Sequence, residues 1–226
     1  DNPMLFGAHV SCAGGVHNAP LNATALGCET FQFFSRSPQG GPAPVLTPEI
    51  CDSFRTNCEA GNLKDWAIHA PYYINFANAE GRIRGNSIRI IREELERGTL
   101  LGASYVMFHP GSAKDVGEEQ GLMYVIEGVK KVYEKYNGTT KLLIEISAGA
   151  GMVIGDTFEE VAAILEGVGN PELGVCFDTA HAFASGYDLR TKAAVDKTFT
   201  QFDKIIGLDR LKMSHCNDSK VEIGAR

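Results

Sequence analysis

Histidine and carboxylate side chains recur where short apolar runs end in this 226-residue sequence. In chain order these residues are His9, His69, His109, Glu145, Asp178, His181 and His215. A lone His of this kind is more often a neutral core residue bonded to the backbone. Here, however, five of the six histidines lie at the end of such a run or just after it. Imidazoles mixed with carboxylates suit zinc or a similar transition ion better than Mg²⁺, so the pattern predicts a metal site.

Glu145 carries a charge at the end of the apolar stretch Leu142-Leu143-Ile144. An unpaired carboxylate is costly to bury, so a cation is expected beside it. That cation is either a metal ion or a Lys or Arg from another loop, since buried charges are paired or metal-bound. Glu145 is therefore the strongest single candidate for a functional residue.

The apolar runs themselves predict seven strands. They are Met4–Val10, Thr30–Phe34, Trp66–His69, Tyr105–His109, Lys141–Ile146, Leu173–Phe177 and Leu211–His215. Helical signals separate them: Thr47-Pro48-Glu49 reads as a helix start, and Ile88, Ile91 and Leu95 repeat at helical spacing. Asp156 with Glu159 predicts a capping box, and a further helix is expected over Ala193–Ile206.

Strands that alternate with helices about every 30 residues predict βαβ units and a parallel sheet. Both an open doubly wound sheet and a closed barrel give this alternation, but only a barrel gathers residues from the ends of many strands. Six of the seven runs close on a residue that can bind metal or move protons. The fold class predicted is α/β of the (βα)8 TIM-barrel type, with about seven βα units present.

Length and composition limit the remaining possibilities. One domain over residues 1–226 is expected, because the chain is too short for two ordinary domains and a linker. No stretch approaches 18 consecutive apolar residues, so a soluble cytoplasmic protein without a membrane partner is expected. The net charge of −7 argues against non-specific coating of nucleic acid, and six cysteines without a Cys-x-x-Cys pair argue against a zinc ribbon.

Several longer segments together resemble endonuclease IV, the barrel-type apurinic/apyrimidinic endonuclease. The matching stretches are Gly7–Gly15, Phe108–Ser112, Ile144–Glu145, Ser147–Gly151, Gly174–Leu189 and His215–Lys220. The resemblance spans the whole chain, and the segment from Gly174 to Leu189 is the most specific part of it.

The resemblance implies a cofactor and a reaction. Three zinc ions would lie in the barrel mouth, and a zinc-activated hydroxide would cut the DNA backbone 5′ to abasic sites and also remove 3′ blocking groups. The implied ligands are His69 and His109 for a first ion, Glu145 as a bridge to a second, Asp178 and His215 for the second, and His181 for the third. Glu145 would be the catalytic residue, whereas His9 matches a position near the site without an implied ligand role.

The resemblance also implies that the partner is double-stranded DNA with abasic sites, bound by a monomer. Tyr72 and Tyr73 match a loop that enters the base stack, although packing beneath the loop is the alternative for both rings. Arg36 and Gln39 lie in a second DNA-contacting loop. That loop departs from the family in residues 37–41, which lack the usual Arg and Trp.

A second departure concerns the end of the chain. Family members continue past Arg226 with an Asp-x-His pair and a Glu that complete the third and second ion sites. We therefore expect a chain truncated at the C-terminus, holding complete ligands for about one to two ions, with a naturally short homologue as the alternative. Two other functions stay open: a xylose-isomerase-like sugar isomerase, whose sites are richer in carboxylates, and a non-catalytic DNA-binding fragment.

Overall fold

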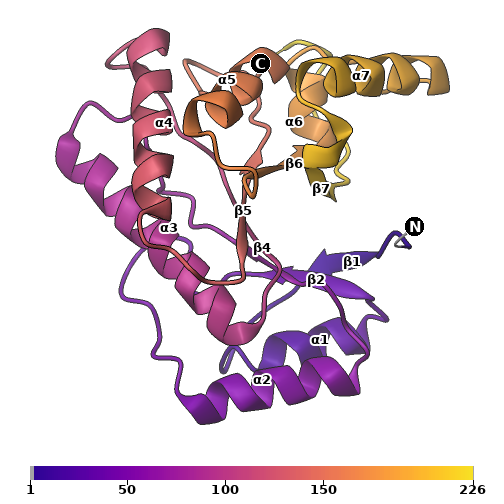
Figure 1. Cartoon of the computed structure of the whole chain (residues 1–226). Coiled ribbons are helices and arrows are strands. Elements are labelled where there is room, and N and C mark those ends of the chain that lie inside the picture. The colour runs from indigo at the N-terminus through magenta and orange to yellow at the C-terminus, as the bar shows by residue number, and fades with distance from the viewer. Residues whose placement is uncertain (1–2, 226) are drawn as a thin grey trace. The chain divides into compact units, whose positions relative to one another are not determined.

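Residues 3–225 of the chain are described by a computed structural model, and in them seven strands alternate with helices (Figure 1). The strands are β1 (Gly7–His9), β2 (Thr30–Phe33), β3 (Ala67–His69), β4 (Tyr105–Phe108), β5 (Lys141–Glu145), β6 (Gly174–Asp178) and β7 (Leu211–His215). The helices are α1 (Asn18–Ala25), α2 (Pro48–Ala60), α3 (Gly81–Leu101), α4 (Glu118–Tyr133), α5 (Phe158–Val168), α6 (Thr179–Ala184) and α7 (Lys192–Ile205), followed by the 3₁₀ turn η1 (Leu208–Arg210). Every predicted strand is present, although β1 begins at Gly7 and not at Met4.

Contacts divide the chain into two compact units, each assembled from segments that are separate in sequence. The first contains residues 3–73, 91–107 and 137–141, and the second contains 74–90, 108–136 and 142–225. The single domain expected from the sequence stays a prediction. The C-terminal end at Arg226, where truncation is expected, lies outside the described residues, as do residues 1–2. Within residues 3–225, no helix combines the length and the apolar character that a membrane crossing requires.

In the first unit, β1 to β4 pair in chain order, and the registers of β1 with β2, β2 with β3 and β3 with β4 are parallel. Helices α1 and α2 lie side by side (Figure 1). Phe54 of α2 packs on Phe31 and Phe33 of β2, with ring centroids 6.0 and 5.4 Å apart. Because parallel strands end at a common edge, this core places His9 and His69 at the same edge of the sheet.

In the second unit, β5, β6 and β7 are parallel neighbours in that order. Phe177 of β6 packs against Phe158 and Phe202, both fully buried, with ring centroids 6.4 and 6.1 Å away. Helix α5 packs against α4 and α7. The three strands therefore present their carboxyl ends, which include Glu145 and Asp178, at one edge of this sheet.

A β-bulge sets the register of the last strand. Val175 lies opposite Leu211, but Cys176 lies opposite Met213, so one residue of β7 is left over between them. As a result Asp178 faces His215, whereas an unbroken register would have placed Ser214 there. Since a one-residue slip moves side chains to the opposite face of a strand, the bulge decides which side chain of β7 reaches Asp178.

Helix starts follow the sequence signals with one correction. Thr47 caps α2, accepting a hydrogen bond from the Ile50 amide, and Pro48 occupies the first turn as predicted. The capping box predicted from Asp156 and Glu159 is wrong by one residue. Thr157 is the cap of α5, and the Glu160 carboxylate accepts from the amides of Gly155 and Asp156. The extended backbone of Thr157 explains the shift, because an N-cap residue must lie outside the helix.

A buried ion pair ties the loop after β2 to α3 within the first unit. The Arg36 Nε lies 2.9 Å from Glu94 Oε1, with side chains 3% and 0% exposed. A second guanidinium nitrogen of Arg36 lies 2.6 Å from Glu93. Arg97 extends the network, donating to the Ser35 hydroxyl and to the Ser35 carbonyl. The loop is thereby fixed by charge-assisted hydrogen bonds away from water.

Replacing Glu94 by Ala should destabilise the protein by about 3–5 kcal/mol, because it removes the fully buried carboxylate that bonds to Arg36 Nε and to the Ser35 hydroxyl, and leaves the buried guanidinium with the partly exposed Glu93. The matched control is Glu96→Ala on the same helix, whose exposed pair with Arg92 should be worth no more than about 1 kcal/mol. Urea unfolding monitored by circular dichroism measures both changes. Equal free energies of unfolding for the two variants would show that the buried pair contributes little.

Candidate metal centre

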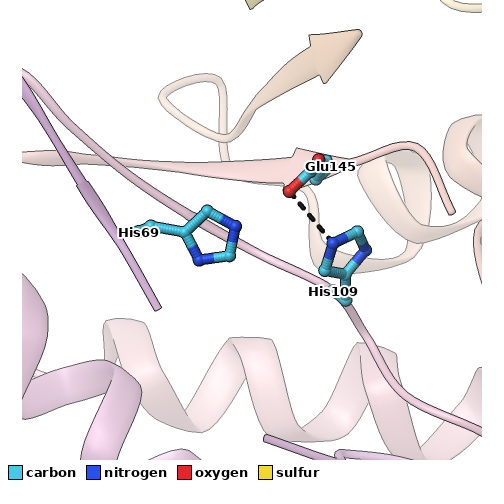
Figure 2. A group of neighbouring side chains, drawn as sticks. All are labelled: His69, His109 and Glu145. Atoms are coloured by element: carbon cyan, nitrogen blue, oxygen red, sulfur yellow. Dashed lines mark ion pairs between the residues drawn. The ribbon is translucent and has the colours of Figure 1, made fainter. Parts of the chain in front are cut away.

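Glu145 is the centre of the polar cluster in the second unit. Its side chain, at the end of β5, is 2% exposed, and its two oxygens face two different imidazoles. Oε2 lies 3.1 Å from Nε2 of His109, which follows β4 (Figure 2). Oε1 lies 2.7 Å from Nδ1 of His215 at the end of β7. Both of these contacts are with imidazoles, a residue type that can itself bind a metal ion.

Asp178 forms the second half of the cluster at the end of β6. Its Oδ2 lies 3.6 Å from His215 Nδ1 and accepts a hydrogen bond from the Asn217 side chain at 2.9 Å. Its Oδ1 accepts from the backbone amide of His181 at 2.9 Å. Both carboxylate oxygens are thus held in place, which fixes the orientation of a side chain that is almost fully buried.

The short helix α6 brings His181 back to the cluster. Asp178 is its N-cap, and one turn later the His181 ring lies with Nδ1 3.7 Å from Asp178 Oδ2 and 3.6 Å from Glu145 Oε1. This helix was not among the predicted elements. The signal that could have revealed it is an Asp directly after a strand, since Asp is a preferred N-cap residue.

The contacts between these side chains favour a charged imidazole at His215 beside an ionised Asp178. Burial alone would lower the pKa of His215, but its bonds to Asp178 and Glu145 outweigh burial and raise this pKa to about 12. Burial would likewise raise the pKa of Asp178, yet hydrogen bonds from His215 and the His181 amide hold it below the ordinary value. Without an ion, the cluster therefore holds a proton on His215.

The donor set of this cluster fits a transition ion. Glu145, Asp178 and His181 offer ligand atoms that all lie within 4.8 Å of one another. Nitrogen and carboxylate ligands bind zinc at about 2.0–2.2 Å, so donor atoms this close to one another can share one ion. Mixed imidazole and carboxylate ligands suit zinc and its neighbours better than Mg²⁺. The residues present therefore fit a metal, and the identity of that metal stays a prediction.

The remaining metal candidate, His69, belongs to the first unit. It is buried at the end of β3, with Nδ1 2.6 Å from the Ala70 carbonyl oxygen. Because a carbonyl can only accept, Nδ1 carries the proton and the lone pair of the neutral ring lies on Nε2. His9 is held at the end of β1 by Gln32, whose Nε2 is 2.8 Å from the His9 Nδ1.

The predicted DNA-binding residues, all in the first unit, differ in their exposure. Tyr72 is 68% exposed and Gln39 is exposed, whereas Tyr73 is half-buried. Arg36 is buried in its ion pair, so in this structure its guanidinium offers no exposed face to a phosphate. We therefore leave Arg36 out of the proposed DNA contacts.

Phe34 is a residue that the sequence reading missed. Its ring lies 5.4 Å from that of Tyr72, 5.3 Å from that of His69 and 4.6 Å from that of His9. Apolar patterning predicted it as the last residue of a strand, but β2 ends at Phe33 and the Phe34 side chain is only partly buried. The exposed Tyr72 ring thus has an aromatic neighbour in Phe34, and the two rings are in a T-shaped arrangement.

Stability of the metal-free protein should fall as pH rises. The folded pKa of His215, about 12, lies above its ordinary value of 6.5. The stabilisation is therefore complete below pH 6.5 and is lost progressively between 6.5 and about 12. Relative to the His215→Asn variant, the free energy of unfolding of the parent should fall by up to about 1.4 kcal/mol per pH unit above pH 7. Urea unfolding at pH 7, 8 and 9 with a chelator measures this difference, and parallel pH profiles would contradict the charged imidazole.

Comparison with known proteins supplies the family. The profile of the family described as Xylose isomerase-like TIM barrel matches residues 21–226. The probable endonuclease 4 of Geobacter sulfurreducens is 38% identical over 223 residues, covering 98% of this chain and 75% of that protein. The crystal structure of endonuclease IV from Thermus thermophilus matches with a TM-score of 0.87 and 35% identity, over 98% of this chain and 79% of that one.

A D-tagatose 3-epimerase-like protein also matches, with a TM-score of 0.71 over 94% of this chain and 76% of that one, but at 18% identity it shares the fold alone. The predicted fold class, α/β of the TIM-barrel type, is confirmed by the matching family and by the alternation of strands and helices. The resemblance inferred from the sequence motifs is confirmed as well. This chain therefore belongs to the endonuclease 4 family of enzymes, within the Xylose isomerase-like TIM barrels.

Proposed function

We propose that this chain is a zinc-dependent DNA-repair phosphodiesterase that hydrolyses the backbone 5′ to abasic sites and removes 3′ blocking groups. Its relatives are named endonuclease 4, and the sugar epimerases that share the fold are much more distant in sequence. The observation that carries the proposal is the buried Glu145 carboxylate, whose two oxygens face the imidazoles of His109 and His215. We expect the protein to act as a monomer in the cytoplasm.

The ligands proposed for zinc in the second unit are His109, Glu145, Asp178, His181 and His215. For His69 the proposal rests on the resemblance in sequence and on the tautomer that the Ala70 carbonyl imposes. When bound, the ions would act as Lewis acids toward the phosphate and would lower the pKa of a water molecule to near neutrality. No Ser or Cys nucleophile is needed for such a reaction.

The residues of the chain would prepare this chemistry by position and protonation. Glu145 turns Oε2 toward His109 and Oε1 toward His215, an arrangement that would suit a carboxylate shared by two ions. His215 must give up its proton to the solvent before its Nδ1 can bind an ion, because metal ligands are deprotonated. Asp178, held by Asn217 and the His181 amide, keeps its orientation during this exchange.

Tyr72 is the residue proposed to enter the DNA base stack at the abasic site. Its ring is largely exposed, and its amide donates to the Pro38 carbonyl, which ties its loop to the loop after β2. Opening the duplex costs least where no base pair has to be broken, and an aromatic ring can fill the resulting gap. Tyr73 and Gln39 are proposed to contact the DNA beside it.

Glu145→Gln should remove most of the cleavage activity. The substitution keeps the shape but removes the charge that would join two ions, and a loss of several kcal/mol corresponds to about a thousandfold in rate. The loss should exceed that of any single His substitution. Initial rates on an abasic duplex, with zinc saturating, measure the effect, and Glu166→Gln on the exposed face of α5 is the matched control. Near-normal turnover in Glu145→Gln would remove Glu145 from the proposed role.

Tyr72→Ala should weaken binding to an abasic duplex by roughly 1–3 kcal/mol, the usual contribution of an aromatic ring stacked on bases. The amount of bound metal should equal that of the parent, so the loss of DNA affinity in this variant would not come from a loss of metal. The control is Phe6→Ala, since Phe6 is also 68% exposed in the first unit and has no proposed role. If fluorescence anisotropy gives the same affinity for the Tyr72 variant and the parent, the ring is structural.

A further inference from the structure

The two residues directly after Glu145 contact the imidazoles of two proposed ligands. The Ile146 carbonyl oxygen lies 3.0 Å from His181 Nδ1. Because this oxygen can only accept, His181 Nδ1 carries a proton and the lone pair of the neutral ring lies on Nε2. The backbone that leaves β5 therefore decides which nitrogen of His181 is available to an ion.

Ser147 makes the corresponding contact with His109. Its Oγ lies 3.3 Å from His109 Nδ1, on the side of the ring opposite the Nε2 that faces Glu145. Ser147 is 2% exposed, so its hydroxyl has little access to solvent. When Nε2 gives its lone pair to an ion, Nδ1 carries the proton and Ser147 Oγ is placed to accept it.

Ser185 holds this segment from the other side. It lies at the C-cap of α6, where its hydroxyl donates to the Ser147 carbonyl at 3.0 Å and accepts from the Gly149 amide at 2.9 Å. Its own amide donates to the His181 carbonyl. One side chain thus joins the helix that carries His181 to the backbone on both sides of Ala148. The sequence motifs contain Ser185 but assign it no role.

We propose that Ser185 is a positioning residue for the metal centre. Its hydroxyl fastens residues 147–149 to α6 and so keeps Ser147 Oγ against His109 and the Ile146 carbonyl against His181. The Nε2 atom of each ring is then the one left to bind a metal ion. The inference rests on the proposed function only in taking these imidazoles as ligands. The Ser147 amide, which donates to the Gly155 carbonyl, is a second restraint, so removal of Ser185 should loosen the segment without unfolding it.

The test measures zinc affinity and imidazole tautomers in the whole chain. For Ser185→Ala, competition with a chromophoric chelator should give a Kd for Zn²⁺ raised roughly tenfold, the lower end of the 10–100-fold cost of losing an outer partner. Ser147→Ala, which removes the direct contact with His109, should raise it further. In the metal-free protein, the ring ¹⁵N shifts of His181 should move from the Nδ1-protonated form toward a mixture of both tautomers when Ser185 becomes Ala.

Two further variants separate positioning from general stability. Ser185→Thr retains the hydroxyl and should restore the parent Kd and the parent ring shifts. Thr200→Ala removes an exposed hydroxyl that bonds only to its own helix, at the Asp196 carbonyl, and should change neither. A Kd for Ser185→Ala within twofold of the parent, or an increase unaccompanied by a change in ring shifts, would overturn the proposal. Zinc binding by the parent without cleavage of abasic DNA would instead count against the proposed function alone.

Discussion

The arrangement of the second unit depends on one constraint, the presence of a carboxylate at the end of a strand that is otherwise apolar. Leu142, Leu143 and Ile144 are fully buried, and Glu145 follows them into the same environment. An ionised carboxylate there requires positive charge and hydrogen bonds to offset its lost hydration. Imidazoles lie against both oxygens, and the protonated ring of His215, which bonds to Oε1, supplies positive charge. An ion bound at the same place would meet the same need, so the feature that makes Glu145 costly to bury also makes it a good ligand.

Parallel strands provide the rest of the geometry at little structural cost. Each βαβ unit returns the chain to the same edge of the sheet, so groups placed at strand ends meet without long loops. Two local irregularities refine this plan. The bulge in β7 places His215 opposite Asp178, and α6, which Asp178 caps, brings His181 Nδ1 to 3.6 Å from Glu145 and 3.7 Å from Asp178. Bulges and short helices of this kind are common where a sheet must aim a side chain at a site.

In the first unit, buried charged groups stabilise the loop after β2. The loop after β2 carries Arg36, a residue type that often contacts phosphate, yet its guanidinium is buried against Glu93 and Glu94. The loop is therefore rigid where a mobile basic side chain would have been expected from its composition. The exposed side chain is instead that of Tyr72, whose amide donates to the carbonyl of Pro38 in that loop and whose ring contacts Phe34. An aromatic side chain has few rotatable bonds and so loses little conformational entropy on binding, as the proposed insertion of Tyr72 into stacked bases would require.

The sequence by itself determined the features that depend on neighbouring residues. Apolar runs identified all seven strands, helical spacing identified α3, and the polar residues at strand ends identified residues that cluster around Glu145. Features that depend on residues far apart in the chain were decided only by the tertiary structure. The partner of Arg36 lies 58 residues away, and the bulge between β6 and β7 arises from pairing with a separate strand. The hydroxyl of Ser185 has a role only because α6 packs beside the end of β5. Local pattern constrains which groups reach an edge of the sheet, but register and packing between distant segments select the atoms that meet there.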